Sequence, residues 1–294
     1  MPEASSPNIP RSEFPSPLTL LRKYGLRPRK SLGQNFLVNL SLAEKIVELS
    51  QVPRQATVVE LGVGLGTLTY ALAQRVRRVI GFELDEKLIK VLKAEGSLPE
   101  NVELRAGDIL KLDYRRLSAE IGHPLILFGN LPYYLSSRLT YKLLKEREAL
   151  ETAVFMFQKE VAERFVAKPG SKDYGQLSVL LGLMARVEWL LTLSPAHFYP
   201  RPEVSSAVLK LEFKPKRFAE EEQLFSLVKV AFAKRRKKLA RNLTALGLSL
   251  TEAQDLLKED GLSPDIRAEA VPPEGFLALA KALRAKALQR HQGA

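Results

Sequence analysis

The sequence contains no cysteine among its 294 residues. Disulfides, thiolate nucleophiles and cysteine-based zinc sites are therefore excluded. Histidine is scarce too, and His123, His197 and His291 are scattered without the spacing that metal ligands show. We accordingly expect neither a metal site nor a catalytic triad built on histidine.

Long apolar runs are also absent, and no stretch approaches the roughly 18–20 residues that a membrane-spanning helix needs. The first residues, MPEASSPNIPRSEFPSP, lack an apolar signal core and are rich in proline and serine. They predict a loose leader over residues 1–15 and no targeting peptide. The absence of a targeting signal favours a cytoplasmic location.

Basic residues outnumber acidic ones by 45 to 33, which gives a net charge of +12 and a pI near 9.8. Such a surplus favours a polyanionic partner, because basic side chains release counterions from phosphate groups. We therefore predict a nucleic acid as the partner rather than a membrane. A basic surface that binds nothing, or one attracted to a membrane surface, is the alternative at this level.

Apolar, β-branched segments alternate with helical patterns in the first half of the chain. The expected strands cover residues 57–61, 79–84, 102–108, 124–130 and 152–158, and the expected helices cover residues 68–75, 85–95 and 136–148. This alternation predicts right-handed βαβ crossovers and a mostly parallel sheet with both faces covered, an α/β fold. Residues 187–194 and 205–213 follow without a helix between them, which predicts a hairpin and one antiparallel edge strand.

The pattern changes after residue 213. Residues 214–218, KPKRF, predict a linker, because Pro215 interrupts strand pairing. Beyond them only helical patterns occur, over residues 220–247, 251–259 and 273–290. We thus expect an α/β domain over residues 16–213 and a small, all-helical domain over residues 219–294.

Residues 60–66, ELGVGLG, place three glycines directly after the first expected strand. Glycine permits a tight turn and a close approach of the backbone to a ligand. Glu83 and Asp108 end the next two strands, where one carboxylate can accept ribose hydroxyls and the other can meet an adenine amine. A turn without a ligand, an exposed strand-end acid and a capping aspartate are the alternative explanations. Together the three features favour a bound adenosine, and S-adenosylmethionine fits better than NAD because nothing here requires a pyrophosphate.

The fourth expected strand ends in Asn130, Leu131, Pro132 and Tyr133. The adenine N6 amine is a poor nucleophile, because its lone pair is delocalised into the ring. The Asn130 side-chain oxygen and the Leu131 carbonyl could accept its hydrogens and favour a pyramidal amine, while Pro132 fixes that carbonyl. Tyr133 could stack on the base, which must leave its own stack to reach the site. On these residues alone, a simple turn after a strand is an equally good explanation.

Seven ordered segments carry a resemblance to a known family. They are KSLGQNFL (30–37), ELGVGLGTLT (60–69), FELD (82–85), AGD (106–108), GNLPYYLSS (129–137), FYPRPEVSSAV (198–208) and AKRRKKLARNL (233–243). In this order they resemble the KsgA/RsmA ribosomal RNA adenine N6,N6-dimethyltransferases, whose wider group includes the Erm resistance methylases. The resemblance implies a Rossmann-like class I methyltransferase domain, with S-adenosylmethionine as the methyl donor and S-adenosylhomocysteine as the product.

The resemblance also implies roles for single residues. The segment from Gln34 to Leu37 would fold over the methionine part of the cofactor, although its own pattern indicates only a loop before a helix. Phe198, in the motif F-x-P-x-P-x-V, would flank the target adenine opposite Tyr133, although hydrophobic packing would explain it equally well. The expected cofactor-binding residues are Gln34, Asn35, Phe36, Leu37, Glu60, Gly62, Gly64, Glu83, Leu84, Gly107, Asp108 and Asn130. The expected catalytic residues are Asn130, Leu131, Pro132, Tyr133 and Phe198, and Tyr134 has no assigned role.

The basic stretch at residues 233–243 predicts a helix that buries Leu239 and Leu243 on one stripe. Its cations are Lys234, Arg235, Arg236, Lys237, Lys238 and Arg241, with no acid among them. Such a run is often a solvated helix face. Mutual repulsion of the like charges makes a phosphate partner the better explanation, and we expect these residues to bind RNA.

Four functions remain to be distinguished at this point. The first is dimethylation of two adjacent adenosines in a 3'-terminal hairpin of 16S rRNA, within an immature 30S subunit and by a monomer. The second is an Erm-type methylation of 23S rRNA, and the third is a mainly non-catalytic role in ribosome assembly. The fourth, a DNA adenine methylase, would require a target-recognition region for which no segment is a candidate. The resemblance to KsgA of the basic stretch favours the first.

Overall fold

The computed structural model describes residues 10–11 and 14–292. The chain forms two compact units. The first contains the described residues up to 162 together with residues 187–215, and the second contains residues 163–186 and those from 216 onward.

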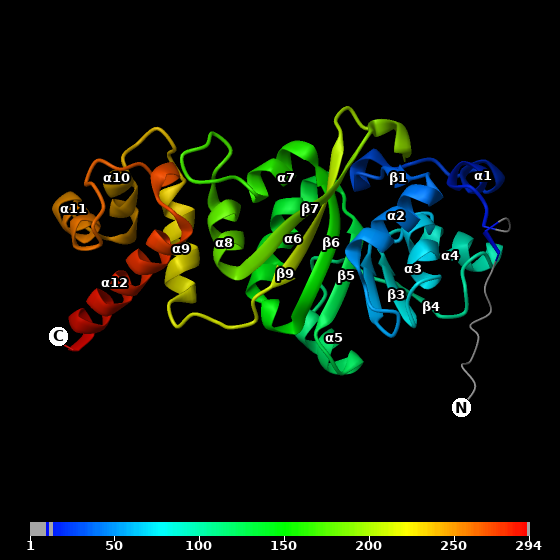
Figure 1. Cartoon of the computed structure of the whole chain (residues 1–294), viewed down its shortest axis with the longest axis horizontal. Coiled ribbons are helices and arrows are strands. Elements are labelled where there is room, and N and C mark those ends of the chain that lie inside the picture. Colours follow the sequence, from blue (N-terminus) through cyan, green and yellow to red (C-terminus); the bar gives the residue numbers. More distant parts are fainter. Residues whose placement is uncertain (1–9, 12–13, 293–294) are drawn as a thin grey trace. The chain divides into compact units, whose positions relative to one another are not determined.

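A seven-stranded sheet forms the centre of the first unit (Figure 1). Its strands are β2 (Thr57–Leu61), β3 (Arg78–Glu83), β4 (Val102–Ala106), β5 (Leu125–Asn130), β6 (Leu150–Gln158), β7 (Ala185–Leu193) and β9 (Ser206–Phe213). Their order is β4-β3-β2-β5-β6-β9-β7. Strands β2 to β6 pair in parallel, as the alternation of apolar segments and helices predicted.

The antiparallel strand lies one position further inside the sheet than predicted. Strand β9 pairs antiparallel with β6, from Thr152 opposite Glu212 to Gln158 opposite Ser206. Strand β7 lies beyond β9 and forms the edge of the sheet. Strand β9 is buried along most of its length, so its apolar residues fit an interior position better than an edge.

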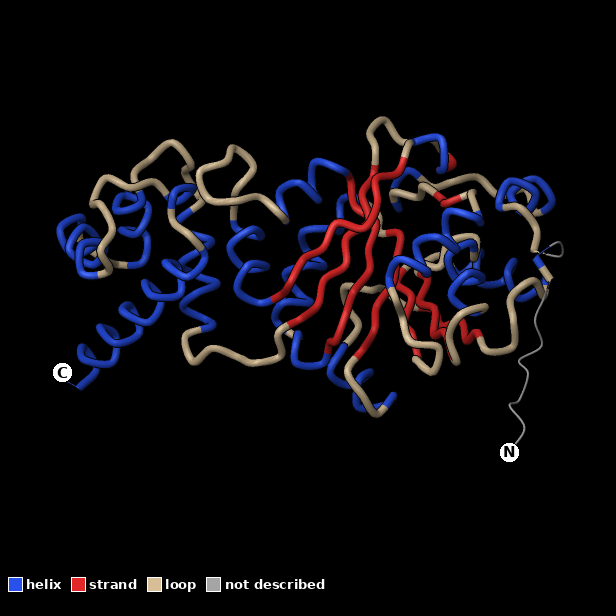
Figure 2. The backbone as a smooth tube through the Cα atoms, viewed as in Figure 1, coloured by secondary structure: helices blue, strands red, loops and turns tan. Residues whose placement is uncertain are grey.

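The helices of the first unit connect and cover these strands (Figure 2). They are α1 (Pro17–Lys23), α2 (Leu40–Ser50), α3 (Thr67–Ala73), α4 (Glu86–Glu95), α5 (Tyr114–Ile121) and α6 (Ser136–Lys145), with α7 (Lys159–Phe165) after β6. Four of them begin with a side chain that accepts a backbone hydrogen bond: Ser16 caps α1, Asn39 caps α2, Asp85 caps α4 and Asp113 caps α5. Two short strands, β1 (Phe36–Leu37) and β8 (Phe198–Tyr199), form a separate antiparallel pair.

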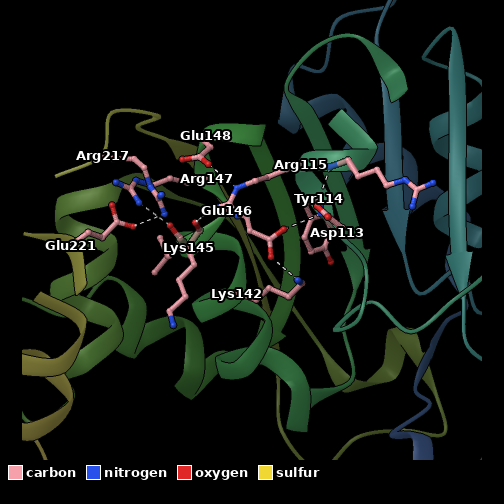
Figure 3. Close-up of polar contacts among 12 residues, drawn as sticks. Asp113, Tyr114, Arg115, Lys142, Lys145, Glu146, Arg147, Glu148, Arg217 and Glu221 are labelled. Carbon is pink, nitrogen blue, oxygen red and sulfur yellow. Dashed lines mark hydrogen bonds and ion pairs between the residues drawn. The ribbon is translucent and has the colours of Figure 1, made fainter. Parts of the chain in front are cut away.

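Polar contacts fasten helix α5 to the end of α6, as Figure 3 shows. The Glu146 carboxylate accepts hydrogen bonds from the Tyr114 backbone N–H at 2.9 Å and from Lys142 at 2.6 Å. Arg115 donates to the Glu148 carboxylate at 2.7 Å. These contacts join the start of α5 to the segment between α6 and β6.

The predicted leader, residues 1–15, lies mostly outside the described residues. Within its described part, Phe14 is buried, and its ring centroid lies 4.5 Å from that of Tyr70. Arg11 forms an ion pair with Glu44 at 3.3 Å. Arg11 and Phe14 are therefore attached to the α/β unit. Burial removes the apolar ring of Phe14 from water, which stabilises this attachment.

The second unit consists of helices, but it does not begin where the sequence predicted. Its helices are α8 (Gln176–Met184), α9 (Glu221–Ala231), α10 (Leu239–Leu243), α11 (Leu250–Glu259) and α12 (Pro273–Gln292). The Tyr174 hydroxyl donates to the Val271 carbonyl at 2.9 Å, and the Tyr174 ring packs edge-on against Phe232. These contacts join residues 163–186 to the helical unit. The structure therefore differs from the two continuous domains predicted over residues 16–213 and 219–294, because residues 163–186 interrupt the first and belong to the second unit.

The predicted linker at residues 214–218 also divides between the units. The carbonyl of Lys214 accepts a hydrogen bond of 3.1 Å from Arg147, whose side chain is fully buried. Residues 187–215 belong to the first unit, and the second unit resumes at Lys216.

Candidate functional site

The glycine loop joins β2 to α3 through three glycines in the left-handed region. Gly62, Gly64 and Gly66 have φ angles of 84°, 59° and 81°, which side chains rarely permit. A Cβ added to Gly64 would lie 3.0 Å from the Phe36 ring. The backbone therefore turns tightly at these glycines and packs closely against Phe36, which precedes α2. A side chain at Gly64 would not fit there.

Glu83, at the end of β3, is held by two backbone amides. Its Oε2 accepts a hydrogen bond from the Gly64 N–H and its Oε1 accepts one from the Asp85 N–H, each at 2.8 Å. Burial raises the pKa of this carboxyl, while the backbone hydrogen bonds oppose the shift. Each carboxylate oxygen still has a second lone pair for a ligand hydroxyl.

Glu60 is the most buried acid of the pocket, with 1% of its surface exposed. Its Oε2 has no hydrogen-bond partner among the described residues. Burial raises its pKa to about 8, with the Thr69 hydroxyl opposing the shift and the nearby Glu83 charge adding to it. A buried acceptor without a partner is costly, and a cationic or hydrogen-bond-donating ligand would satisfy it.

Gly107 and Asp108 follow β4 at the same edge of the sheet. The Gly107 N–H donates to the Glu83 carbonyl at 2.9 Å, which draws the two strand ends together. Asp108 Oδ1 accepts the Leu110 N–H at 2.9 Å, so this side chain does cap a turn. The second carboxylate oxygen is the one that can face a ligand, and the turn and ligand explanations are therefore compatible.

Asn130 ends β5, and its amide orientation is fixed by a contact from a distant segment. Its Nδ2 donates a 2.7 Å hydrogen bond to the carbonyl of Asn35. The side-chain oxygen of Asn130 is consequently the atom that can accept a hydrogen bond from a substrate amine. The Leu131 side chain is buried, and Pro132 begins a single 3-10 turn over Tyr133–Leu135.

Residues 29–37, here called the strap, cross this edge of the sheet before α2. Asn35 binds Asn130 through its carbonyl, and the Leu37 carbonyl accepts a 2.7 Å hydrogen bond from the Thr67 hydroxyl. Phe36 and Leu37 pair with Tyr199 and Phe198 as strand β1. The strap is thus tied to the end of β5 and to the start of α3.

One pocket collects the predicted cofactor residues. All twelve line it: Gln34, Asn35, Phe36, Leu37, Glu60, Gly62, Gly64, Glu83, Leu84, Gly107, Asp108 and Asn130. Pro132 lines it as well, whereas Leu131, Tyr133 and Phe198 do not. Residues that sequence reasoning missed include Gly33, Thr67, Phe82, Ile109 and Tyr134. Thr67 could have been found, because it follows the last glycine of the loop and begins a helix.

The aromatic residues near Asn130 differ from their predicted arrangement. Phe198 is 3% exposed and belongs to a hydrophobic core cluster rather than to the pocket. Alternation along β8 explains this burial, because side chains of successive strand residues point to opposite faces and Tyr199 takes the exposed one. Tyr133 is half-buried, and its hydroxyl shares a 3.0 Å hydrogen bond with Ser206. Neither Phe198 nor Tyr133 lines the pocket, and the predicted arrangement of the two rings on either side of a base stays a prediction.

Tyr134, which the sequence left unassigned, lies against the strap. Its side chain is 55% exposed and lines the pocket. A Cβ added to Gly33 would lie 3.2 Å from the Tyr134 ring, so Gly33 permits this contact. The ring covers part of the pocket from outside and packs on the strap.

Comparison with known proteins assigns the chain to a family. A model of the family described as ribosomal RNA adenine dimethylase matches residues 25–285. The Ribosomal RNA small subunit methyltransferase A of Syntrophus aciditrophicus is 41% identical over 271 residues, which cover 90% of this chain and 97% of that protein. The chain belongs to the ribosomal RNA adenine dimethylase family. It is therefore an RNA-modifying methyltransferase, as the ordered motifs predicted.

Two solved structures support the same fold for this dimethylase. A dimethyladenosine transferase from Plasmodium falciparum superposes with a TM-score of 0.70 at 25% identity, over 85% of this chain and 97% of the other. The 23S rRNA methyltransferase ErmE gives a TM-score of 0.60 at 25% identity, over 84% of this chain and 98% of the other. The Rossmann-like class predicted from the sequence is thus confirmed.

The basic stretch of the dimethylase is a turn where the sequence predicted a helix. Residues 233–236 lie in turns, a bend follows at Lys237, and α10 begins only at Leu239; a helix here would crowd five adjacent cations. Leu239 and Leu243 are both fully buried, as predicted. Arg235 donates to the carbonyls of Lys172 and Tyr174 and so has a structural role within the helical unit.

Four of the five remaining cations of this stretch line a hollow of the helical unit, and Lys234 does not. Arg236, Lys237, Lys238 and Arg241 line it with Arg267, and Lys238 also pairs with Asp265 at 2.6 Å. In the described part of the dimethylase, no helix combines the length and the apolar character needed to cross a membrane.

Proposed function

We propose that this dimethylase transfers methyl groups from S-adenosylmethionine to the N6 amines of two adjacent adenosines in a 3'-terminal hairpin of 16S rRNA. Its substrate would be the immature 30S subunit, and it would act as a cytoplasmic monomer. The relatives named for the small ribosomal subunit favour this target over 23S rRNA. The observation that carries the proposal is the Asn130 amide, whose orientation the Asn35 carbonyl fixes beside the pocket.

The pocket residues fit S-adenosylmethionine. The glycine loop leaves room where side chains would intrude, Glu83 offers acceptors for a ribose, and Asp108 offers one for an adenine amine. The partnerless Oε2 of Glu60 suits the α-ammonium group of the methionine part. When bound, the cofactor would supply an electrophilic methyl group on a sulfonium.

The chain's own contribution to the chemistry is to position and polarise the target amine. In the first transfer the Asn130 oxygen and the Leu131 carbonyl would accept the two amine hydrogens, and in the second one of them would accept the single hydrogen left, which draws the nitrogen lone pair out of conjugation. Pro132, with φ −55°, fixes the backbone next to that carbonyl. Tyr133 would contact the face of the extruded base.

The test is to map methylated nucleotides after incubation with undermethylated 30S subunits and, separately, with 50S subunits. We expect dimethyladenosine at two adjacent positions near the 3' end of 16S rRNA and none in 23S rRNA. Dimethyladenosine in 23S rRNA alone would establish the Erm-type activity instead. Binding to 30S subunits without any methylation would indicate a mainly non-catalytic assembly factor.

A further inference from the structure

Asp85 contacts both Glu83 and the strap, and the function proposed above gives it no role. It stands two residues after Glu83, is 6% exposed and caps α4 by accepting the Lys87 N–H at its Oδ1. Its own N–H donates to Glu83 Oε1 at 2.8 Å. Asp85 therefore shares a backbone hydrogen bond with the acid that faces the ribose.

The second carboxylate oxygen of Asp85 reaches the strap. Its Oδ2 accepts a 3.2 Å hydrogen bond from Gln34 Nε2 and lies 3.5 Å from Arg29 Nε. The Arg29 N–H in turn donates to Gln34 Oε1 at 2.8 Å. The Asp85 carboxylate thus joins helix α4 to the strap, and its backbone N–H joins both to Glu83.

We propose that Asp85 is a positioning residue that holds the strap closed over the cofactor pocket and couples this closure to the orientation of Glu83. The proposal rests on the proposed binding of S-adenosylmethionine. Closure places Gln34 and Phe36 in the pocket wall, so a ligand that fills the pocket is retained as long as Asp85 holds the strap.

The carboxylate form is required because both oxygens act as acceptors. In Asp85→Asn, the single oxygen can cap α4 or accept from the strap, but the amide nitrogen cannot replace the other oxygen. If the oxygen keeps the cap, an N–H donor faces the donors of Gln34 and Arg29. The charge that pairs with Arg29 is also lost. We therefore expect the strap to open more often while the fold persists.

Asp113 offers a matched control, because it caps α5 through the same kind of bond, from the Arg116 N–H at 3.0 Å, and has no contact with the strap. Calorimetry with S-adenosylhomocysteine should give a dissociation constant about tenfold higher for Asp85→Asn, the loss typical of a charge-assisted hydrogen bond. Asp113→Asn should leave that constant unchanged. In turnover, Asp85→Asn should raise KM for S-adenosylmethionine with little change in kcat.

Two further measurements separate strap closure from a general loss of structure. S-adenosylhomocysteine should protect the bonds after Arg29 and Lys30 from trypsin in the unaltered protein and in Asp113→Asn, but not in Asp85→Asn. Arg29→Gln should weaken binding less than Asp85→Asn, because Arg29 is partly exposed, and should have no added effect in the Asp85→Asn background.

Equal dissociation constants and equal protection for Asp85→Asn and Asp113→Asn would overturn the role of Asp85. Additive effects of Arg29→Gln and Asp85→Asn would overturn it as well, since the two residues would then act separately. If the unaltered protein bound no S-adenosylhomocysteine, the proposed cofactor itself would be refuted, and the two failures are thereby distinct.

Discussion

Replacing Asn130 by alanine should weaken cofactor binding modestly and lower kcat strongly, because the nitrogen and the oxygen of its amide have different partners. The Nδ2 donor holds the strap through the Asn35 carbonyl, and the oxygen is the proposed acceptor for the adenine amine. Loss of one neutral hydrogen bond costs about 0.5–1.5 kcal/mol, which corresponds to a roughly 2- to 12-fold weaker binding of cofactor. Loss of an oriented group that acts on the reacting centre costs about 2.7–4 kcal/mol, or roughly 10²–10³ in kcat.

The assay should measure both quantities on the same preparations. Calorimetry with S-adenosylhomocysteine gives the dissociation constant, and incorporation of labelled methyl groups into undermethylated 30S subunits at saturating cofactor gives kcat. Thr67→Val is the comparison variant, because it removes a different hydrogen bond to the strap, at the Leu37 carbonyl, and Thr67 has no proposed contact with the target amine. It should show a similar loss of affinity and a much smaller loss of kcat.

Two results would refute this account of Asn130. A kcat within about tenfold of the unaltered enzyme would contradict the acceptor role, because the expected effect of removing such a group is larger. A dissociation constant unchanged in Asn130→Ala but raised in Thr67→Val would show that the strap does not depend on the contact with Asn35.

Four more substitutions have expected outcomes. Glu83→Ala should raise the dissociation constant for S-adenosylmethionine, since the ribose acceptor and the partner of two amides are lost; an unchanged value in calorimetry would contradict this. Because Glu60 has its pKa raised to about 8 when folded, from about 4.5, stability should decline as pH rises through this interval, and Glu60→Gln should remove the decline in thermal unfolding measured from pH 5 to pH 9. Arg236→Gln should weaken binding to an RNA hairpin and lower the salt slope by about one, measured by filter binding at several salt concentrations. Arg235→Gln should instead lower the melting temperature, as its hydrogen bonds to two carbonyls require; the reverse pattern would contradict both assignments.

Much of the pocket could be predicted from sequence because parallel strands bring their carboxyl ends to one edge of the sheet. Strand β2 occupies residues 57–61 as predicted. Glu83 and Asn130 end its two neighbours, β3 and β5, and Asp108 lies just beyond the end of β4, which pairs with β3. Strands β3 and β5 are largely apolar runs that end at a polar residue, so the local pattern alone indicates where their ligand-facing residues lie.

The failures concern contacts between segments that are far apart in the chain. Phe198 is buried because β8 pairs with β1, and that register depends on residues more than 150 positions away. The assignment of residues 163–186 to the helical unit depends on contacts such as that between Tyr174 and Val271. Neither pairing leaves a periodic signal in the local sequence, which is why composition and spacing could not reveal it.

The hydrogen bond to the strap also explains why position 130 carries an asparagine rather than an aspartate. An acceptor for the amine could be an aspartate as well as an asparagine, so the proposed chemistry alone does not explain the amide. The Asn35 carbonyl lies 2.7 Å from Nδ2 and requires a donor there, which an ionised aspartate could not provide. The amide donates to the strap on one side and can accept from the base on the other. The same hydrogen bond that helps to close the strap over the cofactor pocket therefore aims the acceptor oxygen, so closure and orientation of the target amine occur together.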